Sequence, residues 1–244
     1  MPPLTPNAWL RHDFIVSEAA RVPAGSRLLE IGAGQGALST RLALRHDYLG
    51  LELDAESAIA AGRRLAALGR GRLVHGDLSS LGPADTFDVV CAFEVLEHMA
   101  DDAETLRAWR ARLRPGGLLL LSVPAHQHRF GPWDTAVGHY RRYGREQLTD
   151  LLHAQGFTDV RLHMYGFPLG YLLETARDAI AARRRAPDSR ESPEEATARS
   201  GRSLQPRSWM GAATRVATSP FRMLQRPFAG TALGTGMVAS ARRT

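Results

Sequence analysis

Apolar and amphipathic stretches alternate along most of this chain. Short apolar runs predict strands at Arg27–Ile31, Tyr48–Leu53, Arg72–His75, Phe87–Phe93, Leu118–Val123 and Phe157–Met164. The amphipathic stretches predict helices at Gly36–Arg45, Ala55–Leu68, Asp101–Leu113 and Arg145–Gln155. This order is typical of an α/β protein in which helices cover a largely parallel sheet. The run Phe87–Phe93 is so continuously apolar that we expect it to be buried on both faces.

The pattern loosens after the fifth predicted strand. Residues 124–144 contain several histidines, arginines and aromatic residues with no clear period, and an irregular stretch of this length is usually functional when it lies inside a compact domain. Helical spacing resumes at Leu169–Arg185 and again at Ser208–Gln225. Met237–Arg242 is a candidate final strand that returns to the sheet.

Composition narrows the class of protein. The 244 residues are 44% hydrophobic and 23% charged, as in ordinary globular proteins. The single cysteine, Cys91, lies in an apolar run, so it forms no intramolecular disulfide and fits a reducing compartment. No apolar run reaches the roughly 20 residues that span a bilayer, and Met1–Leu10 lacks the pattern of a signal peptide. We therefore expect a cytoplasmic protein.

The charge is unevenly divided. All 31 basic residues are arginine; residues 1–180 hold 19 of them against 21 acids, whereas residues 181–244 hold 12 against 4 acids. The basic C-terminal segment allows peripheral contact with a membrane surface or another acidic partner. The favoured interpretation is a solvated arginine-rich segment without a partner. Because lysine is absent, a general base must be His, Asp, Glu or Tyr.

The strongest motif is a glycine loop that follows the first predicted strand. In Gly32–Gly36, three glycines let backbone approach a ligand closely at the start of a helix. Glu52 lies 20 residues beyond Gly32, at the end of the second strand, where a carboxylate can accept both hydroxyls of a ribose. This much fits either a nicotinamide dinucleotide or S-adenosylmethionine.

Further residues favour S-adenosylmethionine. Glu30 precedes the loop by two residues and can reach a ligand ammonium, and Asp77 follows the third strand, where it can accept from an adenine amine. Phe87-Asp88-Val89-Val90 leads into Glu94-Val95-Leu96-Glu97-His98-Met99, and Arg114-Pro115-Gly116-Gly117 precedes the fifth strand.

The segments EIGAGQG, GLELD, HGDL, FDVV, EVLEHM and LRPGG, in this order and spacing, resemble the class I S-adenosylmethionine-dependent methyltransferases. The chain looks most like the broad group that contains quinone-biosynthesis and small-molecule methyltransferases. The resemblance covers roughly residues 25–165, and Gly236–Arg242 is similar to the last antiparallel strand of that fold. The resemblance identifies the cofactor specifically, but it says little about the acceptor. One departure is Glu52, where many relatives carry Asp.

The resemblance implies a set of cofactor-binding residues. The glycine loop would face the methionine and ribose, the residues after the second and third strands would hold ribose and adenine, and the pair after the fourth strand would lie near the methyl group. The set is Glu30, Gly32, Ala33, Gly34, Gly36, Glu52, Leu53, Asp77, Leu78, Phe93 and Glu94. The implied product is S-adenosylhomocysteine.

The resemblance also implies a domain organisation. We expect a Rossmann-like, doubly wound, seven-stranded mixed sheet with a helical insertion between strands six and seven. The expected parts are an N-terminal helical cap at 1–24, a methyltransferase core at 25–166, the insertion at 167–232 and the final strand at 233–244. Residues 186–205, rich in Ser, Pro, Glu and Arg, are expected to be a disordered linker.

Three histidines are candidates for catalysis. His139 is the first choice for a general base and His126 the second, because both follow the fifth strand, whose carboxyl end borders the ligand site in open α/β sheets. The alternative for His139 is a hydrogen bond to backbone that holds the loop. His98 is expected to border the active site. Arg141 and Arg142 either bind an acidic acceptor or anchor the loop through salt bridges.

The pattern Glu94-x-x-Glu97-His98 allows a metal site, because two carboxylates and an imidazole lie close enough to share a divalent ion. Some quinone-pathway O-methyltransferases and RNA 3′-end 2′-O-methyltransferases use a similar pattern. We favour the reading without metal, in which the acids are structural.

The predicted reaction is methyl transfer, chiefly to an oxygen of a small organic acceptor. Two other functions stay open. One is an RNA methyltransferase that uses the metal pattern, although nucleic acid is disfavoured as a partner. The other is a non-methylating protein that binds the cofactor on the same fold. The sequence predicts no oligomeric state.

Overall fold

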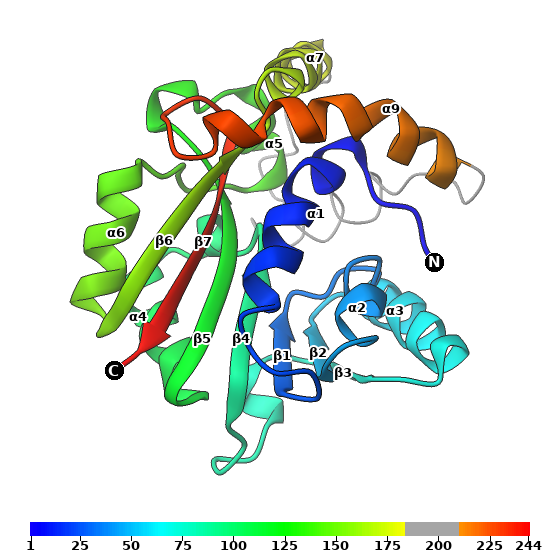
Figure 1. The fold of residues 1–244 in the computed structure, drawn as a ribbon, viewed down its shortest axis with the longest axis vertical. Coiled ribbons are helices and arrows are strands. Elements are labelled where there is room, and N and C mark those ends of the chain that lie inside the picture. The colour runs from blue at the N-terminus through cyan, green and yellow to red at the C-terminus, as the bar shows by residue number, and fades with distance from the viewer. Residues whose placement is uncertain (184–209) are drawn as a thin grey trace.

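The computed structural model describes residues 1–183 and 210–244, which form one twisted sheet covered by helices (Figure 1). The strands are β1 (Arg27–Ile31), β2 (Asp47–Glu52), β3 (Arg72–His75), β4 (Phe87–Phe93), β5 (Leu113–Pro124), β6 (Phe157–Tyr165) and β7 (Gly236–Arg243). Their order in the sheet is β3-β2-β1-β4-β5-β7-β6, and β7 runs antiparallel to both of its neighbours. The predicted seven-stranded mixed sheet is therefore confirmed.

Helices form a layer on each side of the sheet. The helices are α1 (Pro6–Ala19), α2 (Ser39–Leu42), α3 (Ala55–Leu68), α4 (Asp102–Ala111), α5 (Pro132–Val137), α6 (Arg145–Ala154), α7 (Leu169–Arg183) and α9 (Met210–Leu224). Side chains of α1, α2 and α3 join one core cluster, and those of α4 and α6 join the other. Figure 1 shows α1 crossing the front of the sheet, with α7 and α9 beyond the end of the sheet that lies away from the C-terminus.

Strand residues alternate between the two cores. In β1, Leu28 faces the α1 side and Leu29 the α4 side; in β4, Val89 and Val90 divide in the same way. Both faces of a central strand must therefore be apolar. Every residue of β4 except Asp88 is buried, which confirms the prediction made from its continuous apolar run.

In two predicted elements a boundary differs from the prediction by three residues or more. The helix predicted from Gly36 begins only at Ser39, because Gly36 has a φ of +79° that no right-handed helix can include. The fifth strand begins at Leu113 instead of Leu118: Leu113 pairs with Phe87 of β4, and the register then shifts before Val89 pairs with Leu118. The prediction that the Pro-Gly-Gly sequence precedes the strand was therefore wrong.

The irregular stretch after β5 contains local structure that the sequence did not reveal. Gln127–Arg129 form a turn of 3-10 helix, and Pro132–Val137 form α5. Two described helices, α7 and α9, lie between β6 and β7 in the chain. The predicted linker 186–205 lies outside the described residues, and the domain boundaries stay predictions. Within residues 1–183 and 210–244, no helix is long and apolar enough to cross a membrane.

A buried carboxylate joins α1 to the sheet. Glu18, 5% exposed, accepts hydrogen bonds from Ser240 Oγ of β7 at 2.6 Å and from Arg21 Nη1 at 2.7 Å, and it lies 3.0 Å from His163 Nε2 of β6. Burial opposes its charge, but hydrogen bonds from His163, Ser240 and Arg21 prevail and lower the pKa of Glu18 to about 2. The ionised form is therefore the one that holds α1 in place.

We expect Glu18→Gln to lower the free energy of unfolding by about 2 kcal/mol at pH 7, because charged hydrogen-bond partners lose their acceptor. A depressed pKa contributes stability above the unfolded value of 4.5, and this is lost as pH falls toward 2. The difference from wild type, measured by urea unfolding, should therefore shrink between pH 7 and pH 3. Glu104→Gln is the control, since the exposed Glu104 pairs only with Arg107 within the described chain and should matter by less than about 0.5 kcal/mol. An undiminished difference at pH 3 would contradict the assignment.

Candidate active site

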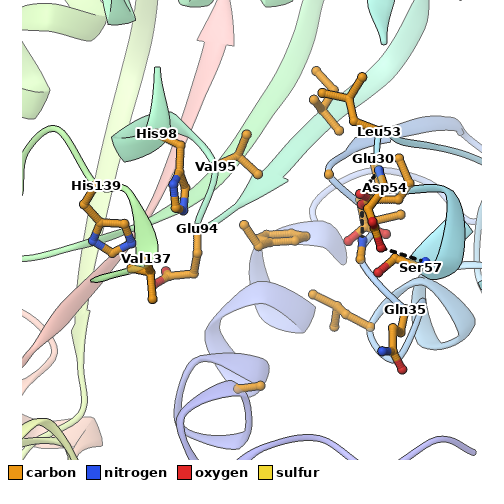
Figure 2. Close-up of a pocket in the computed structure, with 18 of the residues that line it drawn as sticks. Glu30, Gln35, Leu53, Asp54, Ser57, Glu94, Val95, His98, Val137 and His139 are labelled. Atoms are coloured by element: carbon orange, nitrogen blue, oxygen red, sulfur yellow. Dashed lines mark hydrogen bonds between the residues drawn. The ribbon is translucent and has the colours of Figure 1, made fainter. Parts of the chain in front are cut away.

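A large cavity opens where the parallel strands β1, β2 and β4 end. Its volume is about 1270 Å³, beyond the roughly 300–1,000 Å³ of pockets that hold one small ligand. All of the residues predicted to bind the cofactor line it: Glu30, Gly32, Ala33, Gly34, Gly36, Glu52, Leu53, Asp77, Leu78, Phe93 and Glu94. Figure 2 shows two groups facing this space, with Leu53, Asp54 and Ser57 at one end and Glu94, His98 and His139 at the other.

The glycine loop is tied to the second strand. Gly34 N–H donates to Glu52 Oε2 at 2.6 Å, and Glu52 Oε1 accepts from Asp54 N–H at 2.9 Å. The N–H groups of Gly32 and Ala33 both donate to the carbonyl oxygen of Leu51 at 3.0 Å. Glu52 therefore lies at the junction of the loop and β2, where its carboxylate faces the cavity.

Glu30, in the strand that leads into the glycine loop, is buried and hydrogen-bonded to two neighbouring elements. It is 2% exposed and accepts hydrogen bonds from Ser39 Oγ at 2.6 Å and Tyr48 Oη at 2.5 Å. Burial raises the pKa of Glu30 to about 7, although the hydrogen bonds from Ser39 and Tyr48 lower it. Because Glu30 precedes the glycine loop and Ser39 follows it, their hydrogen bond joins the two ends of the loop and supports a role for Glu30 in ordering it.

The far end of the cavity combines an exposed apolar side chain with an acid. Leu53 is 67% exposed, which is unusual for a leucine at the end of a buried strand and suits the face of a planar base. Asp77 Oδ1 accepts from Ser79 N–H at 2.8 Å and from Ser79 Oγ at 2.5 Å, and these bonds lower the pKa of Asp77. An ionised acid here can accept from an amine.

At the opposite end, Glu94 joins several elements. Its Oε1 accepts from Ser122 Oγ of β5 at 2.7 Å and from Tyr165 Oη of β6 at 3.1 Å, and it lies 3.5 Å from Arg11 Nη1 of α1. The backbone of Glu94 has a φ of +59°. Such strain in a residue other than glycine is concentrated at functional sites, where surrounding contacts maintain it.

The pKa values of two neighbouring glutamates shift in opposite directions. Burial alone would raise the pKa of Glu94, but the charge of Arg11 and the hydrogen bond from Ser122 hold it below its usual value. Burial, together with the charge on Glu94, raises the pKa of Glu97 well above its usual value. Glu97 is fully buried, and neither of its oxygens has a hydrogen-bond partner among the described residues.

His139 forms a dyad with an aspartate. Its Nδ1 lies 2.7 Å from Asp134 Oδ1, and an acceptor there assigns the proton to Nδ1 and leaves the lone pair on Nε2. Asp134, 1% exposed, is also bonded to Arg142. Burial opposes its charge, but hydrogen bonds from His139 and Arg142 lower the pKa of Asp134 to about 2. A fixed carboxylate therefore orients the imidazole toward the cavity.

The other two candidate histidines are placed differently. His98 lines the cavity edge-on to His139, with ring centroids 4.6 Å apart, and burial lowers the pKa of His98 to about 4. His126 is not among the residues that line the cavity; it begins the Gln127–Arg129 turn with a φ of +68°. The structure therefore brings His98 to the site and leaves His126 outside it.

The paired arginines anchor the loop, which is the second of the two alternatives that the sequence left open. Arg142 is 3% exposed and bonds to both Asp134 and Glu174. Arg141 pairs with Asp102 at 2.7 Å and donates to the carbonyl oxygen of Ala100 at 2.6 Å. Neither guanidinium is available to bind an acceptor without breaking these bonds.

Sequence reasoning missed two residues of the site. Asp134 could have been found, because Gly131-Pro132 marks a helix start and an acid at the third helical position is a common capping signal. Arg11 carried no local signal, since α1 belongs to the cap and reaches the cavity only through its packing on the sheet.

Three side chains could share a metal ion. Glu97, His98 and His139 each offer one ligand atom, and these atoms lie within 4.8 Å of one another. The hydrogen bond from His139 Nδ1 to a carboxylate is also the usual support of a metal-binding histidine. The donor set fits a divalent cation that accepts nitrogen and oxygen ligands.

The methyltransferase-domain family matches residues 10–162, more than half of the chain, and the chain belongs to this family. This confirms the predicted class, the class I S-adenosylmethionine-dependent methyltransferases, and sets the nicotinamide alternative aside.

Relatives agree with this assignment. A probable S-adenosylmethionine-dependent methyltransferase of Mycolicibacterium smegmatis is 35% identical over 62% of this chain and 60% of its own length. One from Mycobacterium tuberculosis is 32% identical over 64% and 58%. A ubiquinone biosynthesis O-methyltransferase of Aeromonas salmonicida is 35% identical over 47% and 49%. The chain thus matches about half to three fifths of each relative's length.

Solved structures share the fold. The cyclase SpnF superposes with a TM-score of 0.60 at 19% identity, covering 95% of this chain and 79% of its own. The N-methyltransferase NodS of Bradyrhizobium japonicum, solved with S-adenosylhomocysteine, gives a TM-score of 0.57 at 15% identity over 96% and 85%. Because a cyclase and an N-methyltransferase share this architecture, the fold alone does not specify the reaction.

Proposed function

We propose that this protein transfers the methyl group of S-adenosylmethionine to a hydroxyl oxygen of a small organic acceptor. The observation that carries the proposal is the His139–Asp134 dyad, which faces the same cavity as the predicted cofactor residues. The oxygen assignment rests on this base, because a hydroxyl is a poor nucleophile until its proton is removed. The ubiquinone O-methyltransferase relatives support the same choice.

The cofactor residues divide by the part of the ligand they suit. Glu52 and the loop would hold the ribose, and Leu53 with Asp77 would hold the adenine. Arg11 has the charge to pair with the methionine carboxylate, beside the opposite charge of Glu94, 3.5 Å away. Glu94 has the charge to receive the methionine ammonium. With these partners, the sulfonium would lie near the end of β4, toward His139.

The transfer is an in-line displacement. His139 Nε2 would take the proton from the acceptor hydroxyl, whose oxygen would bond to the methyl carbon as the carbon–sulfur bond breaks and its electron pair stays with sulfur. S-adenosylhomocysteine would leave, and Asp134 would stabilise the protonated imidazole. Holding donor and acceptor in line supplies much of the rate, up to about 7–11 kcal/mol in well-oriented systems.

Two measurements on the purified protein test this function. Isothermal titration should show saturable binding of S-adenosylhomocysteine and none of NAD. Incubation with methyl-labelled S-adenosylmethionine and a metabolite extract from a strain that lacks the gene should label an acceptor through an O–CH₃ group. Binding without transfer would instead support a non-methylating protein on this fold, as the cyclase neighbour illustrates.

A second candidate function is metal-dependent methyl transfer. It is favoured by one observation, the convergence of Glu97, His98 and His139 within 4.8 Å around a carboxylate that has no hydrogen-bond partner among the described residues. A cation held there would lower the pKa of a bound hydroxyl. His139 would then serve as a ligand and not as the base.

We expect methyl transfer to survive chelation, since the dyad supplies the base without a metal. The measurement is the initial rate after dialysis against EDTA, compared with the rate after adding back Mn²⁺ or Zn²⁺. Full activity in EDTA supports the first mechanism. A loss of more than about tenfold that either metal restores would establish the second.

Contact between the basic C-terminal segment and an acidic partner stays a prediction.

A further inference from the structure

Three arginines of the described chain line the cavity. Two of them lie close to carboxylates, and the third has no such partner among the described residues. Arg142 bonds to Asp134 and Glu174, and Arg11 Nη1 lies 3.5 Å from Glu94 Oε1. Arg177, on α7, forms no ion pair with any described carboxylate, and its Nε is buried without a hydrogen-bond acceptor among the described residues. A buried donor left unpaired is destabilising, and more so when it is charged.

The side chain of Arg177 is held in a defined position. Its guanidinium lies over the ring of Trp133 on α5, 5.6 Å from the ring centroid. The backbone of Trp133 is held in turn, because its backbone N–H donates to Asp178 Oδ1 at 3.1 Å. The acid next to Arg177 in the chain therefore binds the backbone of α5 and not the guanidinium. A stacked arginine keeps its hydrogen-bonding edge free.

The cavity that Arg177 lines suits an organic anion with apolar surface. Trp133, Val137 and Tyr140 contribute aromatic and apolar surface, and His139 contributes the proposed base. A planar guanidinium donates two parallel hydrogen bonds to a carboxylate or a phosphate, and it does so more strongly where water is excluded. A neutral acceptor would leave the charge of Arg177, which has no ion-pair partner among the described residues, unbalanced in the cavity.

We propose that the acceptor carries an anionic group, a carboxylate or a phosphate, that Arg177 binds while the hydroxyl to be methylated faces His139. This inference rests on the proposed function and names the chemical class of its acceptor. Arg177 is then a specificity-determining residue. The paired Arg141 and Arg142, which follow His139 in sequence, do not have this role.

The test is binding of small probes to the full chain saturated with S-adenosylhomocysteine. Benzoate, phenyl phosphate and benzamide are titrated separately and followed by isothermal calorimetry. We expect at least one anion to bind about 10-fold or more tightly than the neutral amide, the size of a charge-assisted bidentate contact. The stronger of the two anions identifies carboxylate or phosphate as the recognised group.

Variants distinguish binding of the anion by Arg177 from a general effect of positive charge on the protein. Arg177→Gln should remove the preference for the anion, and Arg177→Lys should keep part of it, since the charge remains without the planar fork. Arg183→Gln is the matched control, because Arg183 lies exposed on the same helix and does not line the cavity. It should keep the full preference. Affinity for S-adenosylhomocysteine should be unchanged in all three variants.

Several results would overturn the inference. They are equal binding of anions and benzamide, no saturable binding of either anion, or an undiminished preference in Arg177→Gln. S-adenosylhomocysteine affinity is measured on the same samples, so failure of that binding refutes the proposed function instead. Cofactor binding with no anion preference refutes only the acceptor class.

Discussion

Replacing His139 with alanine should lower kcat by about 10²–10⁴-fold, the usual contribution of a positioned general base. The imidazole lines the cavity, with Nδ1 held 2.7 Å from Asp134 Oδ1 and Nε2 3.8 Å from Glu97 Oε1. Affinity for S-adenosylhomocysteine should change by less than about threefold, because the side chain does not contact the glycine loop or β2. Single-turnover methyl transfer to the acceptor identified by labelling measures the effect.

Two further readouts distinguish a base from a residue that only holds the loop. Added imidazole should restore part of the activity of His139→Ala, and an acceptor analogue with a more acidic hydroxyl should lose less rate than the natural one. Asp134→Asn should lower kcat by favouring the wrong tautomer, as expected of a positioning residue. His153→Gln, an exposed histidine of α6, is the control and should be neutral. Wild-type kcat in His139→Ala would exclude the dyad from catalysis.

Gly36→Ala should destabilise the protein by about 2–4 kcal/mol and weaken S-adenosylhomocysteine binding at least tenfold. A Cβ at this position would lie 2.8 Å from Ala61 Cβ and 2.9 Å from Ala61 Cα, and the φ of +79° disfavours any side chain. Since Ala61 Cα is backbone of α3, the loop or the helix must move. Urea unfolding and calorimetric titration measure the two effects.

A second glycine, Gly69, serves as a control, because a side chain there would meet the same backbone strain without the steric contact. Gly69, at the C-terminus of α3, has a φ of +67°, but a Cβ added there would meet no atom within 4 Å. Gly69→Ala should therefore cost only about 1 kcal/mol and leave cofactor binding unchanged. Adding Ala61→Gly to Gly36→Ala should recover part of the lost stability, because it removes one of the two close contacts. Equal effects of Gly36→Ala and Gly69→Ala would show that close packing of the loop on α3 is unimportant.

Much of the fold was predictable because its signals are local. The continuous apolar run of β4 and the capped helix α3, which begins after Asp54 and ends at Gly69, have the predicted bounds. The errors arose where tertiary contact overrides local preference. Pairing of Leu113 with Phe87 extends β5 through Pro115 and Gly116, and the left-handed Gly36 shortens the helix that follows it.

The candidate site divides in the same way. The cofactor residues follow strands whose carboxyl ends must meet at one edge of the sheet, so sequence order was enough to collect them. The base was harder to choose, because His126 and His139 lie in the same irregular stretch. Only the folded loop shows that Asp134 orients His139 and that His126 begins a turn outside the cavity.

By itself, the sequence determined the sheet and the cofactor, and it predicted the residues that would hold that cofactor, because periodicity and the motifs that carry the family resemblance are properties of neighbouring residues. Tertiary structure decided which ionisable groups meet. It brought Arg11 from the N-terminal cap to Glu94, balanced Arg142 with Asp134 and Glu174, and left Arg177 facing the cavity. Charge pairing depends on distance through space, and for residues on different elements that distance is set only by packing.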